Sequence, residues 1–144
     1  CSAYQVRQYQ QRLSGPILDR IDMYIPVETV AHEQLLEPDQ NDGYEVQLRS
    51  RVVDARAAQY ARLDGRTNAR MTNEDIKARA KLTAPARTLL NTAARQLELS
   101  ARGYMRIIKV ARTIADLEKS NPILPAHVSE ALQYRGLRFL NHSN

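Results

Sequence analysis

The strongest pattern in the sequence is a single amphipathic segment that runs from Ser100 to Leu117. Its apolar residues recur three and four positions apart, which places them on one face of an α-helix. A helix with so regular an apolar face needs other helices to cover it, so the pattern predicts a mainly α fold in the form of a helical bundle. The residues expected on the buried face are Tyr104, Ile107, Ile108, Ala111, Ile114 and Ala115.

The first turn of this helix contains two residues that helices do not favour. Ser100 is a good N-cap, but Arg102 then places a cation at the positive end of the helix dipole, which costs a few tenths to about 1 kcal/mol. Gly103 costs roughly another 1 kcal/mol relative to alanine. A bound anion would compensate, and phosphate is the anion most expected at a helix N-terminus. We therefore predict that Arg102 binds nucleotide phosphate. Arg106 is a weaker candidate and Lys109 follows on the same face, where a solvated basic surface is the alternative.

Four more helical segments are predicted beyond residue 43, each bounded by residues that start or stop a helix. Thr72 and Asp75 form a capping-box pattern, and Pro85 suits the first turn of a helix. With the Ser100 segment they predict a compact bundle of four or five helices. The four segments are Tyr44–Leu63, Thr72–Leu82, Pro85–Leu97 and one that starts at Pro125.

The first 43 residues follow a different pattern. A polar helix is predicted over Ala3–Leu13, and Ser14-Gly15-Pro16 ends it. The segment Ile21–Val27 alternates apolar and mixed residues and predicts one β-strand. Because a lone strand is not stable, its sheet partners are expected outside this chain. Residues 28–43 are acidic and rich in Asp, Asn and Gln, which indicates a linker.

Charge is distributed unevenly along the chain. There are 21 Lys and Arg residues against 16 Asp and Glu residues, a net charge of +5. Six of the acidic residues lie between Glu28 and Leu48, where there is no Lys or Arg, so the rest of the chain is more basic than the net charge suggests. Most of the cations are arginines, whose planar side chain suits phosphate. The pattern predicts a polyanionic partner, nucleotide or nucleic acid, with an ordinary solvated surface as the alternative.

Several classes of protein are disfavoured by what the sequence lacks. Cys1 is the single cysteine, which excludes an internal disulfide framework, and the three histidines are not clustered, so no metal site is predicted. No apolar run approaches the length of a membrane span, and we expect a cytoplasmic protein with no membrane partner. The five glycines are isolated and none precedes a lysine, so there is no Walker A motif. No strand ends in paired acids of the Walker B kind, and the chain alone is not expected to hydrolyse ATP.

Two long runs and one short run resemble a single protein family. The long runs are Arg12–Asp22 (RLSGPILDRID) and Leu99–Leu117 (LSARGYMRIIKVARTIADL), and the short run is Glu130–Arg135 (EALQYR). They resemble the C-terminal part of magnesium-chelatase-like AAA+ ATPases of the bacterial ComM/YifB type. The resemblance covers essentially the whole chain and is weakest through residues 28–43.

The resemblance implies a division of the chain and roles for two arginines. Residues 1–27 would be the C-terminal tail of the AAA+ core, 28–43 an acidic linker and 44–144 the helical lid domain. Arg20 resembles the arginine finger, which reaches into the nucleotide site of the neighbouring subunit. Arg102 resembles the sensor-2 residue, which contacts the γ-phosphate from the lid of its own subunit.

The same resemblance implies the remainder of an ATP-driven machine. ATP and Mg²⁺ would be bound by Walker motifs upstream in the parent protein, and Cys1 would be the last member of a cysteine-rich loop. No cofactor is expected for the isolated chain. The parent protein would be a homo-oligomeric ring, a hexamer, that acts on DNA in branch migration, recombination or competence.

Two alternatives stay open at this point. A stand-alone helical DNA-binding or protein-interaction module would explain the basic surplus, although the cations are spread over many helices rather than placed on one recognition helix. A magnesium-chelatase ATPase subunit is the second alternative, although no apolar aromatic cleft for a tetrapyrrole is predicted. Tight, steeply salt-dependent DNA binding by the isolated chain would favour the stand-alone module.

Overall fold

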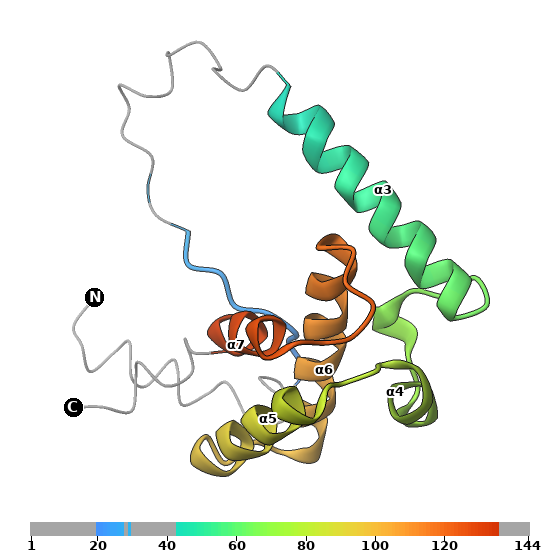
Figure 1. The fold of residues 1–144 in the computed structure, drawn as a ribbon. Helices are drawn as coiled ribbons and strands as arrows, with labels where there is room; N and C mark the ends of the chain where they lie inside the picture. Colours follow the sequence, from blue (N-terminus) through green and yellow to red (C-terminus); the bar gives the residue numbers. More distant parts are fainter. Residues whose placement is uncertain (1–19, 28, 30–42, 136–144) are drawn as a thin grey trace.

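The computed structural model describes residues 20–27, 29 and 43–135, and over these residues the chain is mainly α-helical, as the sequence predicts. Within those ranges it forms five α-helices, one short 3-10 helix and no β-strand (Figure 1). Leu82 and Ile123 form one isolated parallel β-bridge. The helices are α3 (Tyr44–Arg62), η2 (Asn68–Arg70), α4 (Asn73–Arg79), α5 (Ala84–Gln96), α6 (Ala101–Leu117) and α7 (Pro125–Gln133).

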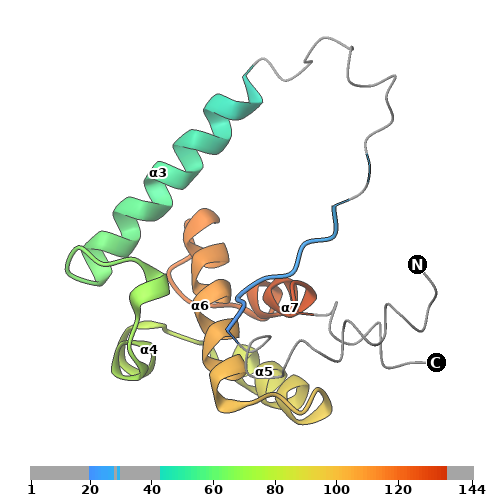
Figure 2. The same cartoon turned by 180° about the vertical axis from the view of Figure 1, so that it is seen from behind.

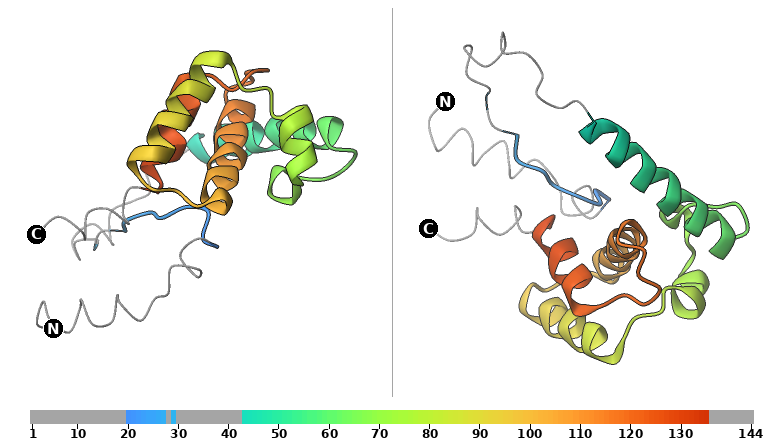
Figure 3. Two further views of the ribbon diagram at one scale, coloured as in Figure 1. Left: turned by 90° about the horizontal axis from the view of Figure 1, so that it is seen from below. Right: turned by 45° about the horizontal axis from the view of Figure 1, so that its top comes forward.

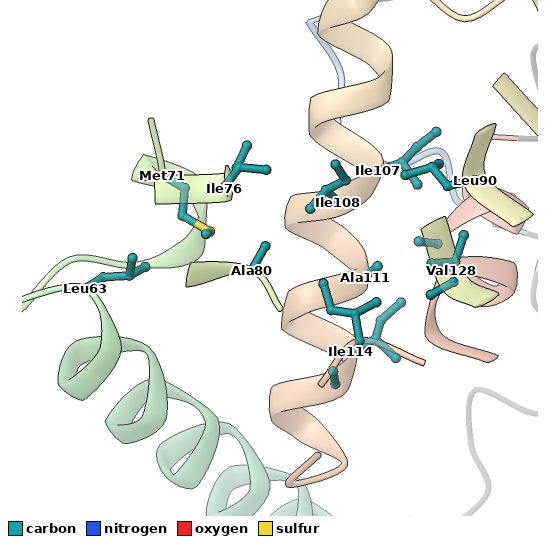
Figure 4. Packing of buried hydrophobic residues seen from close by; sticks show 14 residues of the cluster. Leu63, Met71, Ile76, Ala80, Leu90, Ile107, Ile108, Ala111, Ile114 and Val128 are labelled. Carbon is teal, nitrogen blue, oxygen red and sulfur yellow. The ribbon is translucent and has the colours of Figure 1, made fainter. Parts of the chain in front are cut away.

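Helix α6 lies at the centre of the bundle, with α3 and α4 on one side and α5 and α7 on the other (Figures 1 and 2). The predicted apolar face of α6 is confirmed: Ile107 is 1% exposed and Ala111 is fully buried, while Tyr104 is only partly buried. Figure 4 shows Ile107 directed at Leu90 on one side of α6 and Ile108 directed at Ile76 on the other. The central place of α6 follows from its wide apolar face, which contacts neighbours in two directions.

The starts of the helices follow the capping residues that the sequence predicts. The hydroxyl of Ser100 accepts a hydrogen bond from the backbone N–H of Gly103 at 3.0 Å and so caps α6. Thr72 and Asp75 form the predicted capping box at the start of α4, with bonds of 2.9 and 3.1 Å between each backbone N–H and the other side chain. These caps satisfy amides that would otherwise lack partners.

Helix α3 buries few of its apolar residues. Its residues Ala55 and Gln59 are buried, whereas its larger apolar residues are exposed. The reason lies in its placement, because only the C-terminal half of α3 packs near α6 and the N-terminal half projects beyond the bundle (Figure 1). The exposed residues of α3 include Tyr44, Val46, Leu48, Val52, Val53 and Tyr60.

The predicted strand over Ile21–Val27 is not formed. These residues make one backbone hydrogen bond to the bundle, from the N–H of Tyr24 to the carbonyl of Tyr134 at 2.8 Å. A strand needs a ladder of such bonds with a second strand, and the described residues offer none. The helix predicted over Ala3–Leu13 and most of the acidic linker 28–43 lie outside the described residues, and the division of the chain into those parts stays a prediction.

Candidate functional site

Arg102 is the second residue of α6 and is exposed at the N-terminal end of the helix. Among the residues that the structure describes, no hydrogen bond or ion pair is formed by its guanidinium group. The Ser100 hydroxyl already caps the Gly103 amide, so the cation lies at the positive end of the helix without a carboxylate to offset it. Within the described residues, none of the five donors of the guanidinium has an acceptor, so an anion could take them.

Gly103 has a structural explanation that the sequence did not reveal. A Cβ atom placed on Gly103 would lie 3.4 Å from the Nη2 atom of Arg135 and 3.4 Å from the hydroxyl of Ser100. The residue is buried, and Arg135, whose guanidinium lies beside it, is only 4% exposed. The glycine therefore provides room for a close approach and does not require a bound anion. The argument for an anion at this end of α6 rests on Arg102.

Arg106 is paired with a carboxylate of the protein. Its Nη1 atom forms a salt bridge with the side chain of Asp22, which is 84 residues away in the sequence. Lys109, one turn further along, donates from Nζ to the backbone carbonyl of Ala69 at 3.1 Å. The predicted basic face of α6 is thus divided in two, because Arg102 has no partner in the described ranges whereas Arg106 and Lys109 contact other parts of the chain.

Arg20 is exposed and begins the described part of the N-terminal segment. Residue Asp22, two positions further on, pairs with Arg106 of α6 and not with Arg20. The segment then passes α6 and bonds through Tyr24 to the end of α7, so that it lies against the bundle (Figure 3). The structure therefore places the arginine predicted to act on a neighbouring subunit in a segment that contacts the helix of Arg102.

Sequence reasoning missed a buried charged cluster at the other end of α6. Asp116, 4% exposed, receives both terminal nitrogens of Arg62 from α3, at 2.9 Å to Oδ1 and 2.6 Å to Oδ2. Asn68 donates to the same carboxylate at 2.8 Å. Arg112, one turn before Asp116, donates from Nε at 3.2 Å and lies 3.0 Å away through Nη2. The carboxylate thus joins α3, η2 and α6.

Arg112 completes this cluster with bonds to backbone carbonyls. It is 1% exposed and donates to the carbonyls of Ala80 at 3.3 Å and Ser120 at 2.6 Å. Burial lowers the pKa of Arg112, and the charge of Asp116 opposes that shift. The signal in the sequence was an arginine and an aspartate four residues apart, both adjacent to the apolar face of the helix. Arg112 is therefore a structural residue, saturated by protein acceptors.

A groove of about 770 Å³ runs between α3, α4 and the C-terminal end of α6. Its lining includes several alanines, among them Ala57 and Ala61. The cations at its edge have protein partners, since Arg79 pairs with Asp64 and Lys119 pairs with Asp54. It contains none of the predicted site residues, which are Arg20, Arg102 and Arg106.

The described residues also bear on the predicted absence of metal ligands and membrane spans. No group of three or more His, Cys, Asp or Glu side chains that could hold a metal ion is found among them. In the same residues, none of the helices combines the length and the apolar character that crossing a bilayer requires.

These observations define a class of protein: a mainly α-helical domain that presents two exposed arginines, Arg20 and Arg102, from two segments in contact. The chain belongs to the magnesium chelatase ChlI family. The family described as "Magnesium chelatase, subunit ChlI C-terminal" matches residues 45–135, and the one described as "Magnesium chelatase, subunit ChlI" matches residues 1–35.

Curated relatives place the chain in the ComM/YifB branch of this family. It is 38% identical over 136 residues to the competence protein ComM of Haemophilus influenzae, covering 94% of this chain and 26% of the relative. It is 34% identical over 143 residues to YifB of Escherichia coli, covering 99% of this chain and 28% of the relative. The protein Rv2897c of Mycobacterium tuberculosis is 31% identical over 137 residues, with 94% and 27% covered. The chain thus spans about a quarter of the length of these relatives.

Proposed function

We propose that this chain is the C-terminal lid portion of an AAA+ ATPase and that it contributes two arginines to ATP hydrolysis in an oligomeric motor. Arg102 acts as the sensor-2 residue and binds the γ-phosphate of the nucleotide in its own subunit. Arg20 acts as the arginine finger and completes the site of the neighbouring subunit. ATP and Mg²⁺ are bound by parts of the complete protein that carry the Walker motifs, and the isolated chain binds neither.

The exposed and unpaired state of Arg102 carries the proposal. A guanidinium at the N-terminal end of a helix destabilises the fold by a few tenths of a kcal/mol to about 1 kcal/mol. Within the described residues, no acceptor binds the Arg102 guanidinium and offsets this cost. Nucleotide phosphate would accept hydrogen bonds from the guanidinium and would meet the positive end of the helix dipole. The residues present therefore fit a phosphate group. During phosphoryl transfer the same charge would stabilise the γ-phosphate oxygens.

Arg20 supports the second half of the proposal by its exposure. It lies at the surface with no partner among the described residues, and Asp22 beside it is held by Arg106. An arginine that reaches into another subunit must be available in the free chain. A finger supplied in this way raises the hydrolysis rate about 10³–10⁵-fold. The division of roles also explains why a chain without a Walker A motif carries arginines suited to phosphate.

The decisive experiment measures ATP turnover by the complete ATPase and its variants. We expect Arg20→Ala to lower kcat by about 10³-fold or more. Arg102→Ala should lower kcat/KM about 10- to 100-fold, which corresponds to one lost charged hydrogen bond of about 1.5–3 kcal/mol. Arg95→Ala, which removes an exposed arginine from α5, is the matched control and should leave turnover unchanged.

Mixing experiments test whether Arg20 acts between subunits. An Arg20→Ala subunit and a subunit with a disabled Walker A motif should each be inactive alone. In a mixed ring the second supplies Arg20 to the intact nucleotide site of the first, so activity should recover. Normal turnover by Arg20→Ala alone would contradict the finger role. Absence of recovery in mixed rings that assemble would contradict its action in trans.

DNA is the proposed substrate on which the motor acts, in branch migration, recombination or competence. The support is the basic surplus of the chain and its relationship to a protein named for competence. ATPase stimulation by duplex or branched DNA in the complete protein tests this part. The alternative of a stand-alone helical module that binds DNA or protein predicts instead that this chain binds its partner tightly on its own. The alternative of a magnesium-chelatase ATPase subunit predicts stimulation by a chelatase partner and not by DNA.

A further inference from the structure

We propose that the ion pair between Asp22 and Arg106 is a positioning pair that holds the segment carrying Arg20 against the helix that begins at Arg102. The inference rests on the proposed function, because it concerns the placement of the two proposed phosphate-binding arginines. It assigns Arg106 a role in orientation instead of direct contact with nucleotide. It also gives Asp22 a role that the sequence did not suggest.

Contacts to two parts of the bundle, the second turn of α6 and the end of α7, attach the segment 20–27. The carboxylate of Asp22 receives Nη1 of Arg106, in the second turn of α6. The N–H of Tyr24 donates to a carbonyl at the end of α7 at 2.8 Å. The carbonyl of Ile21 accepts from Nη1 of Arg135 at 3.4 Å. Residues 21–24 are therefore fixed on both sides of Asp22, directly after Arg20.

The ion pair links the segment of Arg20 to the helix of Arg102 through two charged side chains. Asp22 is two residues from Arg20, and Arg106 is one helical turn from Arg102 on the same face of α6. A movement of the first turn of α6 would thus pass to Arg20 through one side-chain contact. Because Arg20 serves the neighbouring site and Arg102 its own site in the proposed ring, the pair connects two successive nucleotide sites.

The exposure of the pair indicates that its main contribution is not to folding. The side chain of Arg106 is 26% exposed and that of Asp22 is 52% exposed, and pairs of this kind add little to global stability. Placement of a catalytic group is far more sensitive, since a shift of about 1 Å can cost about 10²-fold in rate. Loss of the pair should therefore leave the bundle folded while it releases the segment and misplaces Arg20.

The first test measures amide exchange of Tyr24 by NMR in the 144-residue chain. We expect Asp22→Asn and Arg106→Gln each to raise the exchange rate of this amide about two- to fivefold, with unchanged circular dichroism. The matched control is Asp54→Asn, which removes a carboxylate of similar exposure from its pair with Lys119 on another part of the surface. The control should leave Tyr24 unchanged. An unchanged exchange rate in Asp22→Asn and Arg106→Gln would overturn the proposal.

The second test measures ATP hydrolysis by the complete ATPase. We expect Asp22→Asn and Arg106→Gln each to lower kcat about tenfold with little change in KM, a smaller loss than that of Arg20→Ala. The charge-exchanged double variant Asp22→Arg with Arg106→Asp should recover most of the lost kcat. Faster exchange of Tyr24 combined with normal kcat, or a double variant no better than the single ones, would overturn the positioning role. Normal turnover by Arg20→Ala would instead overturn the proposed function, while the exchange measurement would still judge the attachment of the segment.

Discussion

The two ends of helix α6 each carry an arginine, and the protein treats them in opposite ways. Arg112 at the C-terminal end is 1% exposed, and its guanidinium donates to Asp116 and to backbone carbonyls. Arg102 at the N-terminal end is exposed and has no partner among the described residues. In the same helix, Arg112 therefore stabilises the packing of the bundle, whereas Arg102 is available to bind a ligand. Satisfied donors mark Arg112 as structural, whereas Arg102 is a candidate because an unpartnered cation lies at the positive end of the helix.

Other arginines of the bundle fall between these extremes. Arg66 is 37% exposed and binds Asp75 through both terminal nitrogens, at 2.8 and 3.1 Å. Arg106 is 26% exposed and has a single carboxylate partner. The loss of stability on substitution should therefore be largest in the buried cluster around Asp116, smaller at Arg66 and Arg106, and smallest at Arg102. The loss of function should follow the opposite order.

The largest effect on stability is expected from Asp116→Ala. The substitution leaves Arg112 and Arg62 without the carboxylate that both contact, and breaking a buried pair in this way costs about 3–5 kcal/mol. Urea unfolding followed by circular dichroism measures the free energy. Asp54→Asn, which disrupts the exposed pair with Lys119, should change it by less than about 1 kcal/mol. A similarly small change for Asp116→Ala would show that the cluster is not structural and would remove the contrast between the two ends.

The sequence was sufficient to predict most of the bundle because α6 combines strong signals. The apolar spacing from Ile107 to Ala115 and the cap at Ser100 point to the same helix, and the structure confirms both. The cluster around Asp116 was not predictable in the same way. Its partners Arg62 and Asn68 are 54 and 48 residues away, and no local pattern brings them together. From the sequence, a polar residue beside an apolar face is predicted to be exposed, and only the position of the neighbouring helix shows that it is buried.

Helix α3 and Gly103 show why other details required the structure. The apolar residues of α3 predict a buried face, but burial depends on where α3 crosses α6, and only Ala55 and Gln59 are covered. Gly103 suggested an anion because its local helix propensity is poor, whereas its neighbour Arg135 supplies the reason. For the candidate site, the sequence placed Arg20 and Arg102 in separate segments. The pairing of Asp22 with Arg106, which brings those segments into contact, has no signal along the chain.

Substitution of Gly103 tests whether this glycine is needed for the close approach of Arg135 at the N-terminal end of α6. Gly103→Leu would push its side chain into the guanidinium of Arg135, and overpacking of this kind costs about 1–3 kcal/mol. Gly103→Ala is the matched control, because one added methyl group at 3.4 Å is near the limit of ordinary contact and gains helix propensity. Its stability should stay within about 1 kcal/mol of the wild type. Thermal unfolding measures both, and a Leu variant as stable as the Ala variant would show that Arg135 does not pack there.

The partly exposed ion pair between Arg66 and Asp75 can be tested by the pH dependence of stability. Hydrogen bonds from Arg66 and then from the backbone of Thr72 hold the pKa of this carboxyl well below its ordinary value of 3.8. A lowered pKa in the folded chain means that the stabilisation is present above pH 3.8 and is lost as the pH falls below it. Asp75→Asn should therefore be less stable than the wild type at neutral pH, and the difference should shrink below pH 4. Thermal unfolding between pH 2 and pH 7 measures this, and parallel curves would contradict it.

Substitution of Arg102 is expected to have the smallest effect on stability and the largest difference between its effects on stability and on activity. Arg102→Ala removes a cation from the positive end of α6 and should leave the free energy of unfolding unchanged or raise it by a few tenths of a kcal/mol. Arg102→Glu places an anion there and should stabilise the chain by about 0.3–1 kcal/mol, while it repels phosphate and lowers ATP turnover in the complete protein. Urea unfolding and turnover assays measure the two effects. A variant that gains stability while it loses activity indicates a residue kept for its ligand. If Arg102→Ala lowered the free energy of unfolding by more than about 1 kcal/mol, Arg102 would be a structural residue like Arg112, and the two ends of α6 would not differ in this respect.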